Sequence, residues 1–169
     1  ASIGSGIFGY KAYTTFSNGG NAIVLLYDSD SGNLLSIIEA AALGRIRTGA
    51  TTGLATKYMS REDSTVVGII GSGNQASAQI EAVCAVRKIK GIRVYSRTFE
   101  KRDAFATRMR KYLQMAVTSV ESGEECIRGS DIVITITDAR EPVLKGEWLM
   151  EGTHVNAAGS NHWMRREID

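Results

Sequence analysis

Residues 66–82 read VVGIIGSGNQASAQIEA, and this stretch decides the fold. A short apolar run is followed at once by GSGNQA and then by a segment whose apolar residues have helical spacing. In a strand–loop–helix unit, the first glycine allows a tight turn and the second lets the backbone approach a pyrophosphate, while a small third residue packs the helix against the strand. The helix N-terminus then offers free N–H groups and a positive dipole end to the phosphates. The stretch predicts a dinucleotide-binding loop made by Gly71, Ser72, Gly73, Asn74 and Gln75.

Downstream of this loop, apolar strands alternate with helices. We expect strands at residues 65–70, 91–95, 115–120, 131–137 and 153–158, and helices at residues 75–87, 100–113 and 122–128. The strands are apolar throughout, which is typical of parallel strands that are buried on both faces. The pattern therefore predicts an α/β fold with a Rossmann-like, doubly wound parallel sheet over residues 63–169.

The first part of the chain has a different pattern. Apolar runs at residues 21–27 and 34–39 flank the turn sequence DSDSGN and predict a β-hairpin. The Ala/Thr/Gly-rich segment at residues 40–59 predicts a closely packed helix. We therefore expect residues 1–62 to be part of a smaller α+β domain, with the boundary in the polar segment SREDS.

The hairpin turn also partly matches a calcium-binding loop. Asp28, Asp30 and Glu39 have the spacing of three calcium ligands. However, Gly32 and Asn33 are swapped relative to what such a loop needs, and no helix pattern precedes the turn. We expect no metal site.

Composition limits the class of protein. The 169 residues are 43% hydrophobic and 22% charged, with a formal net charge of +2, which is typical of a soluble globular protein. No apolar run is long enough to span a membrane, so no membrane partner is expected. Cys84 and Cys126 have neither a disulfide framework nor a metal-ligand spacing, which suits a reducing, cytoplasmic location. The chain begins in Gly-rich sequence without Met and stops in the charged stretch RREID, so we expect it to be a fragment of a longer protein.

Many of the basic residues lie between Arg87 and Lys111. Aromatic residues are not interleaved with them as a base-stacking surface would need, so no nucleic-acid partner is expected. A plain solvent-facing helix is the expected interpretation of Lys101, Arg102, Arg108, Arg110 and Lys111.

The end of the second strand indicates which dinucleotide is bound. An NAD-dependent enzyme has Asp or Glu at this point to accept a hydrogen bond from the ribose 2′-hydroxyl. This chain instead has Ser96, Arg97 and Thr98, whose hydroxyls and guanidinium suit a 2′-phosphate. We predict NADP as the cofactor, with NAD as the alternative. The competing interpretation is that Arg97 is merely a solvated surface residue.

Six segments together resemble the ornithine cyclodeaminase/mu-crystallin family. They are GYKAYTTF, RIRTGATTGLATKY, GIIGSGNQA, RVYSRT, SDIVITITDAREPVLKGEWL and HVNAAGSN, in this order and nearly from end to end of the chain. Family members are considerably longer, which agrees with a fragment. The resemblance implies a small α-amino or α-imino acid as substrate. It also implies a homodimer formed through the smaller domain.

The resemblance further implies roles for individual residues. Lys11 and Arg47 would bind the α-carboxylate of the substrate, and Lys11 would also be a catalytic residue. Without the resemblance, Lys11 would be interpreted as an ordinary exposed lysine. The cofactor would be lined by Thr137, Val155, Asn156, Ala157 and Arg165.

Asn161 departs from the cyclodeaminase pattern. Cyclodeaminases resemble NAVGGD where this chain has NAAGSN, and their Asp is the general base for proton transfers around an internal hydride transfer. An amide can orient a substrate but cannot accept a proton, so we expect Asn161 to be a catalytic residue that only positions the substrate. The neighbouring His162 is either a titratable group or an ordinary polar loop residue.

The expected function is therefore hydride transfer between a nicotinamide and a small α-imino or α-amino acid. Two alternatives stay open. One is ornithine cyclodeaminase with a different base, which would release ammonia and form proline. The other is a non-catalytic NADPH-binding protein.

Overall fold

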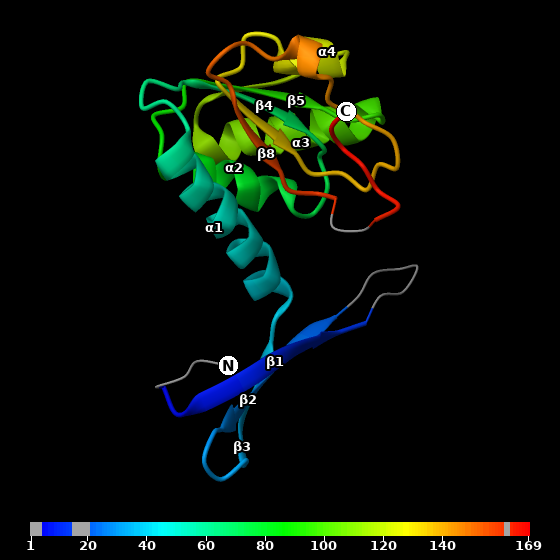
Figure 1. The fold of residues 1–169 in the computed structure, drawn as a ribbon. Helices are drawn as coiled ribbons and strands as arrows, with labels where there is room; N and C mark the ends of the chain where they lie inside the picture. Colours follow the sequence, from blue (N-terminus) through cyan, green and yellow to red (C-terminus); the bar gives the residue numbers. More distant parts are fainter. Residues whose placement is uncertain (1–4, 15–20, 161–162) are drawn as a thin grey trace. The chain divides into compact units, whose positions relative to one another are not determined.

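The computed structural model describes residues 5–14, 21–160 and 163–169 (Figure 1). Contacts divide the chain into two compact units, Ala1–Arg47 and Thr48–Asp169. The helix α1 (Ala41–Met59) runs across this division. The boundary expected from the sequence lies later, after residue 62 in the polar segment SREDS. The extent of each domain in the intact protein stays a prediction.

The first unit contains a three-stranded antiparallel sheet in the order β1-β2-β3. Its strands are β1 (Ile7–Tyr13), β2 (Ala22–Asp28) and β3 (Leu34–Glu39), so the expected hairpin is confirmed. Asp28 closes the hairpin turn, because one of its carboxylate oxygens accepts hydrogen bonds from the backbone N–H groups of Asp30 (3.1 Å) and Ser31 (2.7 Å). The near match to a calcium loop is thus a turn, and the described residues contain no group of three or more His, Cys, Asp or Glu arranged to hold a metal.

This small sheet leaves most of its apolar side chains exposed. Ala40 is the one buried residue among the described residues up to Arg47. Exposed large apolar side chains project from each of its strands: Ile7, Phe8, Tyr10, Tyr13, Ile23, Leu34, Leu35, Ile37 and Ile38. A sheet of this size needs a covered apolar face to be stable in water.

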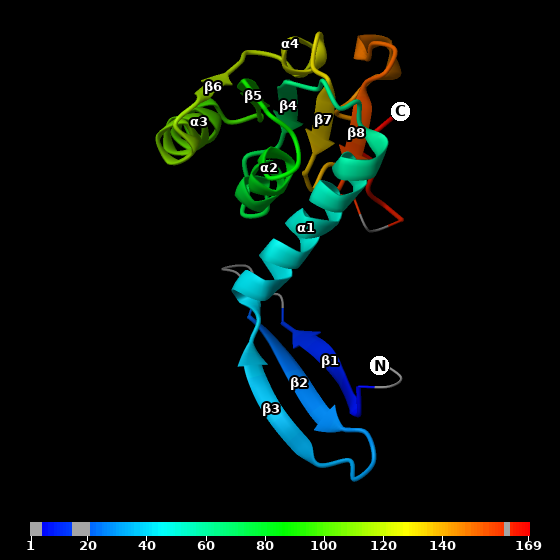
Figure 2. The ribbon, with the colours of Figure 1, turned by 90° about the vertical axis from the view of Figure 1, so that its left-hand side faces the viewer.

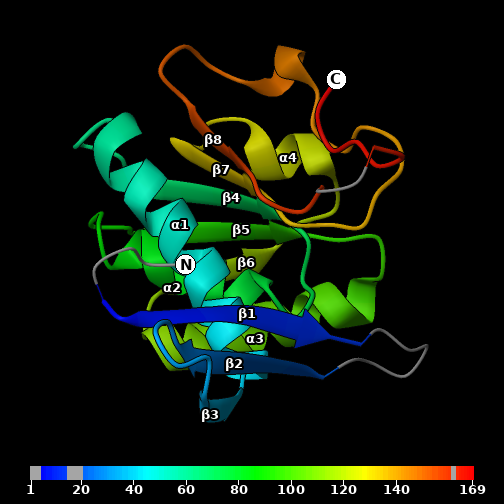
Figure 3. The ribbon, with the colours of Figure 1, turned by 60° about the horizontal axis from the view of Figure 1, so that its bottom comes forward.

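The second unit contains a five-stranded parallel sheet in the order β6-β5-β4-β7-β8 (Figure 3). The strands are β4 (Val66–Ile70), β5 (Gly91–Tyr95), β6 (Ala116–Ser119), β7 (Ile132–Thr135) and β8 (His154–Ala157). The connections between them contain α2 (Ala76–Cys84), α3 (Phe99–Leu113), α4 (Gly123–Ile127) and the 3₁₀ turn η1 (Gly146–Trp148). The predicted doubly wound α/β sheet is confirmed.

Helices cover both faces of this sheet, with α2 and α3 on one side and α4 on the other (Figure 2). The core under α2 and α3 includes Ile69, Ile80, Phe105 and Met109, each at most 2% exposed. A second, smaller core lies under α4. Apolar strands are buried from both sides, which explains why their sequences do not alternate.

The helix α1 packs very closely on α2 within the second unit. Its buried residues, Gly49, Thr52, Gly53 and Thr56, recur at helical spacing along one face. A Cβ atom on Gly49 or Gly53 would collide with the backbone of α2. This close approach explains why the later part of α1 is grouped with the parallel sheet. Neither α1 nor any other helix among the described residues is long and apolar enough to cross a membrane.

Candidate dinucleotide-binding site

The loop between β4 and α2 needs glycine at its first position for a geometric reason. Gly71 has φ +116°, and a Cβ atom here would collide with the carbonyl group of Ile136. Its backbone N–H also donates to the carbonyl of Tyr95, 2.8 Å away, at the end of the neighbouring strand. Because only glycine adopts such a φ without strain, the loop turns sharply at the carboxyl end of β4.

Gly73 differs from Gly71, because among the described residues no atom beyond its own and its chain neighbours' lies within 4 Å of where its Cβ would be. The protein itself therefore does not require glycine at this position. The residue is exposed, and a missing side chain keeps the backbone open to a ligand.

The N-terminus of α2 is suited to an anion. Gln75 is the N-cap residue, yet its side chain makes no capping hydrogen bond. The Oε1 atom of Gln75 is buried and accepts no hydrogen bond from the described residues. A helix end that the Gln75 side chain does not cap, beside the exposed Gly73, fits a pyrophosphate group, so the geometry fits the cofactor that the sequence predicts.

The end of β5 is joined to the glycine loop by two hydroxyls. The Oγ atoms of Ser72 and Ser96 are hydrogen-bonded at 2.9 Å. Arg97 and Thr98, which follow, are exposed at the edge of the sheet. The residues expected to meet the adenosine ribose thus lie next to those expected to meet the pyrophosphate.

Arg102 does not face solvent, contrary to the expectation from the basic helix. It is 5% exposed, because it lies on the inward face of α3. Its guanidinium pairs with Glu121 (2.5 Å), donates to the Ser96 carbonyl (3.1 Å), and lies over the rings of Tyr95 and Phe99. Arg102 therefore fixes the backbone of the segment that follows β5.

The loops that follow β7 and β8 meet at a buried carboxylate, that of Glu167. The Oε1 atom of Glu167 accepts from the backbone N–H and the hydroxyl of Thr137, both at 2.7 Å. Its Oε2 atom accepts from Thr135 Oγ1 (3.1 Å) and from the backbone N–H groups of Gly159 (2.8 Å) and Ser160 (3.1 Å). One side chain thus holds the two loops on the opposite side of the glycine loop from Ser96.

The side chain of Asn156 is already used inside the protein. Its Nδ2 atom donates to Thr56 Oγ1 at 3.0 Å, and its Oδ1 atom lies 3.2 Å from His154 Nε2. Val155 packs in the smaller core, and Ala157 is exposed. Contacts of Val155, Asn156 and Ala157 with a cofactor stay a prediction. Because the Asn156 side chain is already hydrogen-bonded, its predicted contact is one made by its backbone.

Residues 13–169 match the ornithine cyclodeaminase/mu-crystallin family. The chain belongs to this family. A Δ1-pyrroline-2-carboxylate reductase of Bacillus cereus is 41% identical over 140 residues, which are 83% of this chain and 43% of that protein. The chain therefore spans less than half the length of that curated relative.

Solved structures of the family have the same fold. The Thermococcus litoralis Δ1-pyrroline-2-carboxylate reductase in complex with NADH and L-proline is 40% identical, with a TM-score of 0.88, over 95% of this chain and 52% of that one. A dimeric archaeal alanine dehydrogenase with bound NAD is 31% identical, with a TM-score of 0.91, over 98% of this chain and 53% of that one.

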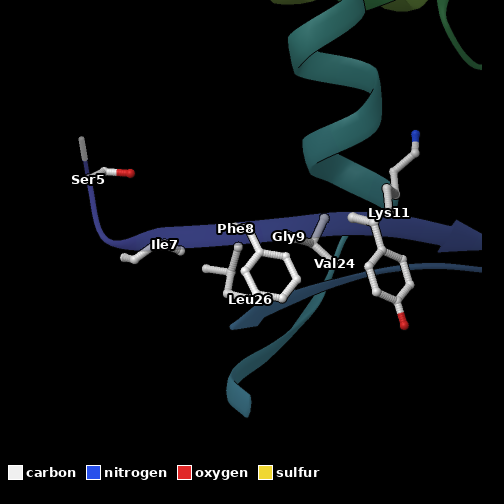
Figure 4. Close-up of a pocket in the computed structure, with 8 residues that line it drawn as sticks. Ser5, Ile7, Phe8, Gly9, Lys11, Val24 and Leu26 are labelled. Atoms are coloured by element: carbon white, nitrogen blue, oxygen red, sulfur yellow. The ribbon is translucent and has the colours of Figure 1, made fainter. Parts of the chain in front are cut away.

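The residues that the family resemblance assigns to the substrate are placed only in part. Lys11 lies on β1, and its Nζ atom is 5.3 Å from the centre of the Tyr13 ring. Lys11 is among the residues that line an open groove of about 410 Å³. Its side chain points away from Phe8 and Leu26 (Figure 4). Arg47 is exposed on α1. The proposal that Lys11 and Arg47 share one carboxylate stays a prediction.

The remaining predicted residues of this family member lie near the end of the chain. Asn161 and His162 lie outside the described residues. Arg165 is exposed, and its backbone carbonyl accepts from Ser160 Oγ at 2.6 Å. Its contact with the cofactor stays a prediction.

Sequence reasoning missed Glu167 and the hydrogen bond between Ser72 and Ser96. Glu167 stands in a charged stretch that indicates a solvated segment, and nothing in its spacing marks it as buried. The Ser72–Ser96 contact joins residues from two strand ends, and the parallel order of β4 and β5 was the one signal that could have suggested it.

Proposed function

We propose that the intact protein is an NAD(P)H-dependent reductase that converts a small α-imino acid into the corresponding α-amino acid. The observation that carries this proposal is the exposed Gly73 beside a helix N-terminus that the Gln75 side chain does not cap, in a chain 40% identical to a reductase that binds NADH and L-proline. In open α/β sheets, ligands bind in the crevice where the strand order reverses, which here is between β4 and β7.

The chain's own residues would bind and orient the reactants. When bound, the reduced nicotinamide supplies a hydride to the imine carbon. The main-chain N–H groups of the glycine loop and of the first turn of α2 would hold the pyrophosphate. Arg47 as a bidentate donor and Lys11 as a point charge would hold the substrate carboxylate. Asn161 would hydrogen-bond the substrate without acting as a base, because an amide has no useful pKa.

NADP(H) is the proposed cofactor, with NAD(H) as the alternative. Arg97 is exposed at the end of β5, and Arg102 adds a second, buried guanidinium that orders this segment. A guanidinium forms charge-assisted hydrogen bonds with a phosphate. The segment has no carboxylate to accept from a 2′-hydroxyl, which argues for the phosphorylated dinucleotide.

The test is a comparison of two reactions on the intact protein. Oxidation of NADPH and NADH is followed with Δ1-pyrroline-2-carboxylate, and release of ammonia is followed with ornithine. We expect imine-dependent oxidation of NADPH and no ammonia. Robust ammonia release with Asn161 in place would instead establish the cyclodeaminase, while tight NADPH binding without either reaction would establish a non-catalytic binder.

An Asn161→Asp variant sharpens this comparison. A carboxylate would restore a proton acceptor beside the substrate, which is worth about 10²–10⁴ in rate in favourable geometry. We expect this variant, unlike Asn161→Ala, to gain some ammonia release from ornithine.

Assembly and location complete the proposal. We propose a homodimer, as in the related alanine dehydrogenase structure, with the exposed apolar side chains of the first unit's sheet contributing to the interface. Sedimentation of the intact protein as a monomer at micromolar concentration would count against it.

We also propose a cytoplasmic location, since Cys84 and Cys126 are free thiols, as is usual in a reducing compartment.

A further inference from the structure

Glu167 is an unusual carboxylate because it is buried while no cation of the described residues pairs with it. The residue is 2% exposed, and its two oxygens accept five hydrogen bonds from two hydroxyls and three backbone N–H groups. Among the described residues, no Lys, Arg or His forms an ion pair with it. Burying a charge is costly unless its hydrogen-bonding capacity is fully used, so this arrangement requires all five donors to stay in place.

The groups that Glu167 holds belong to the carboxyl edge of the sheet. Thr137 follows β7, whereas Gly159 and Ser160 follow β8. A Cβ atom on Gly159 would collide with the backbone of Thr137 and with Glu167 itself, so the two loops touch around this carboxylate. The backbone of Glu167 is held as well, because its carbonyl oxygen accepts hydrogen bonds from the backbone N–H groups of Val143 (2.9 Å) and Leu144 (3.0 Å).

The sheet order places these loops on the nicotinamide side of the proposed site. The pyrophosphate belongs above the end of β4, at the glycine loop, and the adenosine ribose belongs at the end of β5. Since β7 and β8 lie on the other side of β4 from β5, the remaining half of a dinucleotide must extend over the ends of β7 and β8. Glu167 therefore orders only the loops that would lie against the nicotinamide half of the dinucleotide.

Glu167 also determines what Thr137 can offer to a ligand. The hydroxyl proton of Thr137 is donated to Glu167, because a carboxylate only accepts hydrogen bonds. The same hydroxyl oxygen accepts from the backbone N–H of Ala139 at 3.2 Å. Thr137 can thus present a remaining lone pair, but no donor, to the nicotinamide side.

We propose that Glu167 is a positioning residue that shapes the nicotinamide half of the dinucleotide site and fixes the Thr137 hydroxyl as a hydrogen-bond acceptor. This inference rests on the proposed function, because it requires that a dinucleotide binds at this edge. In this proposal Glu167 does not contact the cofactor or the substrate. It acts through the two loops.

The test compares a whole dinucleotide with its adenosine half. The dissociation constants of NADPH and of 2′-phospho-ADP-ribose, which lacks nicotinamide, are measured on the intact protein and on its Glu167→Gln variant. Glutamine has nearly the same shape, but its NH₂ group faces two or three donors whichever way the amide is turned. We expect NADPH to bind about tenfold more weakly and 2′-phospho-ADP-ribose to bind within about twofold of the wild type.

A general loosening of the fold would weaken both ligands equally, and that result would overturn the proposal. Unchanged binding of both ligands would overturn it as well. If the wild-type protein bound neither ligand, the proposed function itself would fail, which is a different outcome from an altered ratio.

A milder pair of variants decides the matter if Glu167→Gln does not fold. Thr135→Val removes one donor to Glu167 from a residue that is fully buried, whereas Thr153→Val removes a hydroxyl that bonds the Ser130 carbonyl (3.2 Å) near the opposite edge of the sheet. We expect Thr135→Val alone to weaken NADPH relative to 2′-phospho-ADP-ribose, by about twofold to fivefold. If the ratio of the dissociation constants of NADPH and 2′-phospho-ADP-ribose were the same in both variants, the proposal would be rejected.

Discussion

The two edges of the parallel sheet are each held together by one carboxylate, but the two carboxylates are held differently. At the amino edge, Asp131 accepts from the backbone N–H groups of Thr65 (2.8 Å) and Val66 (3.0 Å) and pairs with Arg61 (2.6 Å). At the carboxyl edge, Glu167 accepts five hydrogen bonds and forms no ion pair within the described part of the chain. Asp131 therefore connects two strands with the help of a cation, whereas Glu167 connects two loops through the hydroxyl and backbone N–H donors of the described residues.

This difference predicts that substitutions at the two carboxylates affect different properties, namely stability and ligand binding. The Asp131 contacts join the starts of β4 and β7, which are parts of the core, so a change there should alter stability. The Glu167 contacts order loops at the edge where α/β sheets bind ligands, so a change there should alter binding. Substitutions at each edge can test this separation.

The largest expected effect comes from Gly71→Ala, which alters the packed backbone of the glycine loop and not the contacts of either carboxylate. The new methyl group would collide with the Ile136 carbonyl, and the residue would have to keep φ near +116°. We expect a loss of about 3 kcal/mol or more in the free energy of unfolding, measured by denaturant titration.

Gly73→Ala is its matched control in the same loop. Because none of the described residues beyond its chain neighbours has an atom within 4 Å of the added carbon, we expect stability within about 0.5 kcal/mol of the wild type. Dinucleotide affinity should nevertheless fall, since the methyl group would occupy the space where the backbone meets the pyrophosphate. Equal stabilities of the two variants would contradict this account of the loop.

The next effect is at the amino edge, from Asp131→Asn. Burial alone raises the pKa of Asp131, but the backbone N–H groups of Thr65 and Val66 and the Arg61 guanidinium more than offset it, so the pKa lies below its ordinary value of 3.8. We expect the variant to lose about 1–3 kcal/mol in the free energy of unfolding while its dissociation constant for NADPH is unchanged.

The pH dependence of Asp131 has a defined sign. Because its pKa is lower in the folded state, its contribution to stability is present above the unfolded value and is lost as the pH falls through the folded value. Acid unfolding of Asp131→Asn should therefore lack this component. A weaker affinity for NADPH in the same variant would break the separation between the two edges.

Arg97→Ala tests the adenosine side of the carboxyl edge. If the guanidinium binds a 2′-phosphate, we expect wild-type protein to prefer NADP(H) to NAD(H) by at least about tenfold, the equivalent of about 1.5–3 kcal/mol for one charge-assisted pair. The variant should lose this preference without a change in unfolding, since Arg97 is exposed. Fluorescence titration of both reduced cofactors measures it, and a preference that survives the substitution would exclude Arg97 as its source.

The smallest effect is expected from His154, which lies at the start of β8 and away from the ligand edge. Burial lowers the pKa of His154 and nearby Arg87 adds to this, while the hydrogen bond with Asn156 opposes it, so the pKa stays below 6.5. At a pH between the lowered pKa of the folded state and 6.5, the unfolded chain binds more protons than the folded one. Stability therefore falls as the pH drops below about 6.5. Thermal unfolding of His154→Gln should show a weaker dependence over this range, and an identical dependence would point to another group.

Several features were predictable because they depend on residues close together in the chain. The glycine loop, the alternation of apolar strands with helices and the hairpin each follow from local periodicity and turn residues. Arg102 shows where such reasoning ends. A run of basic residues gives no sign of which side chain faces inward, because this depends on the rotation of α3 against β5 and β6.

The sequence by itself determined the fold class, the position of the phosphate loop and the family, since these rest on segments whose order and spacing carry the signal. Only the tertiary structure decided that Gly71 is required by the protein while Gly73 is left open to a ligand, and that Ser72 meets Ser96. It also decided that Glu167, in a tail that looks solvated, is buried between two loops. The physical reason is that a carboxylate's environment is set by donors brought from distant strand ends, and no local pattern records them.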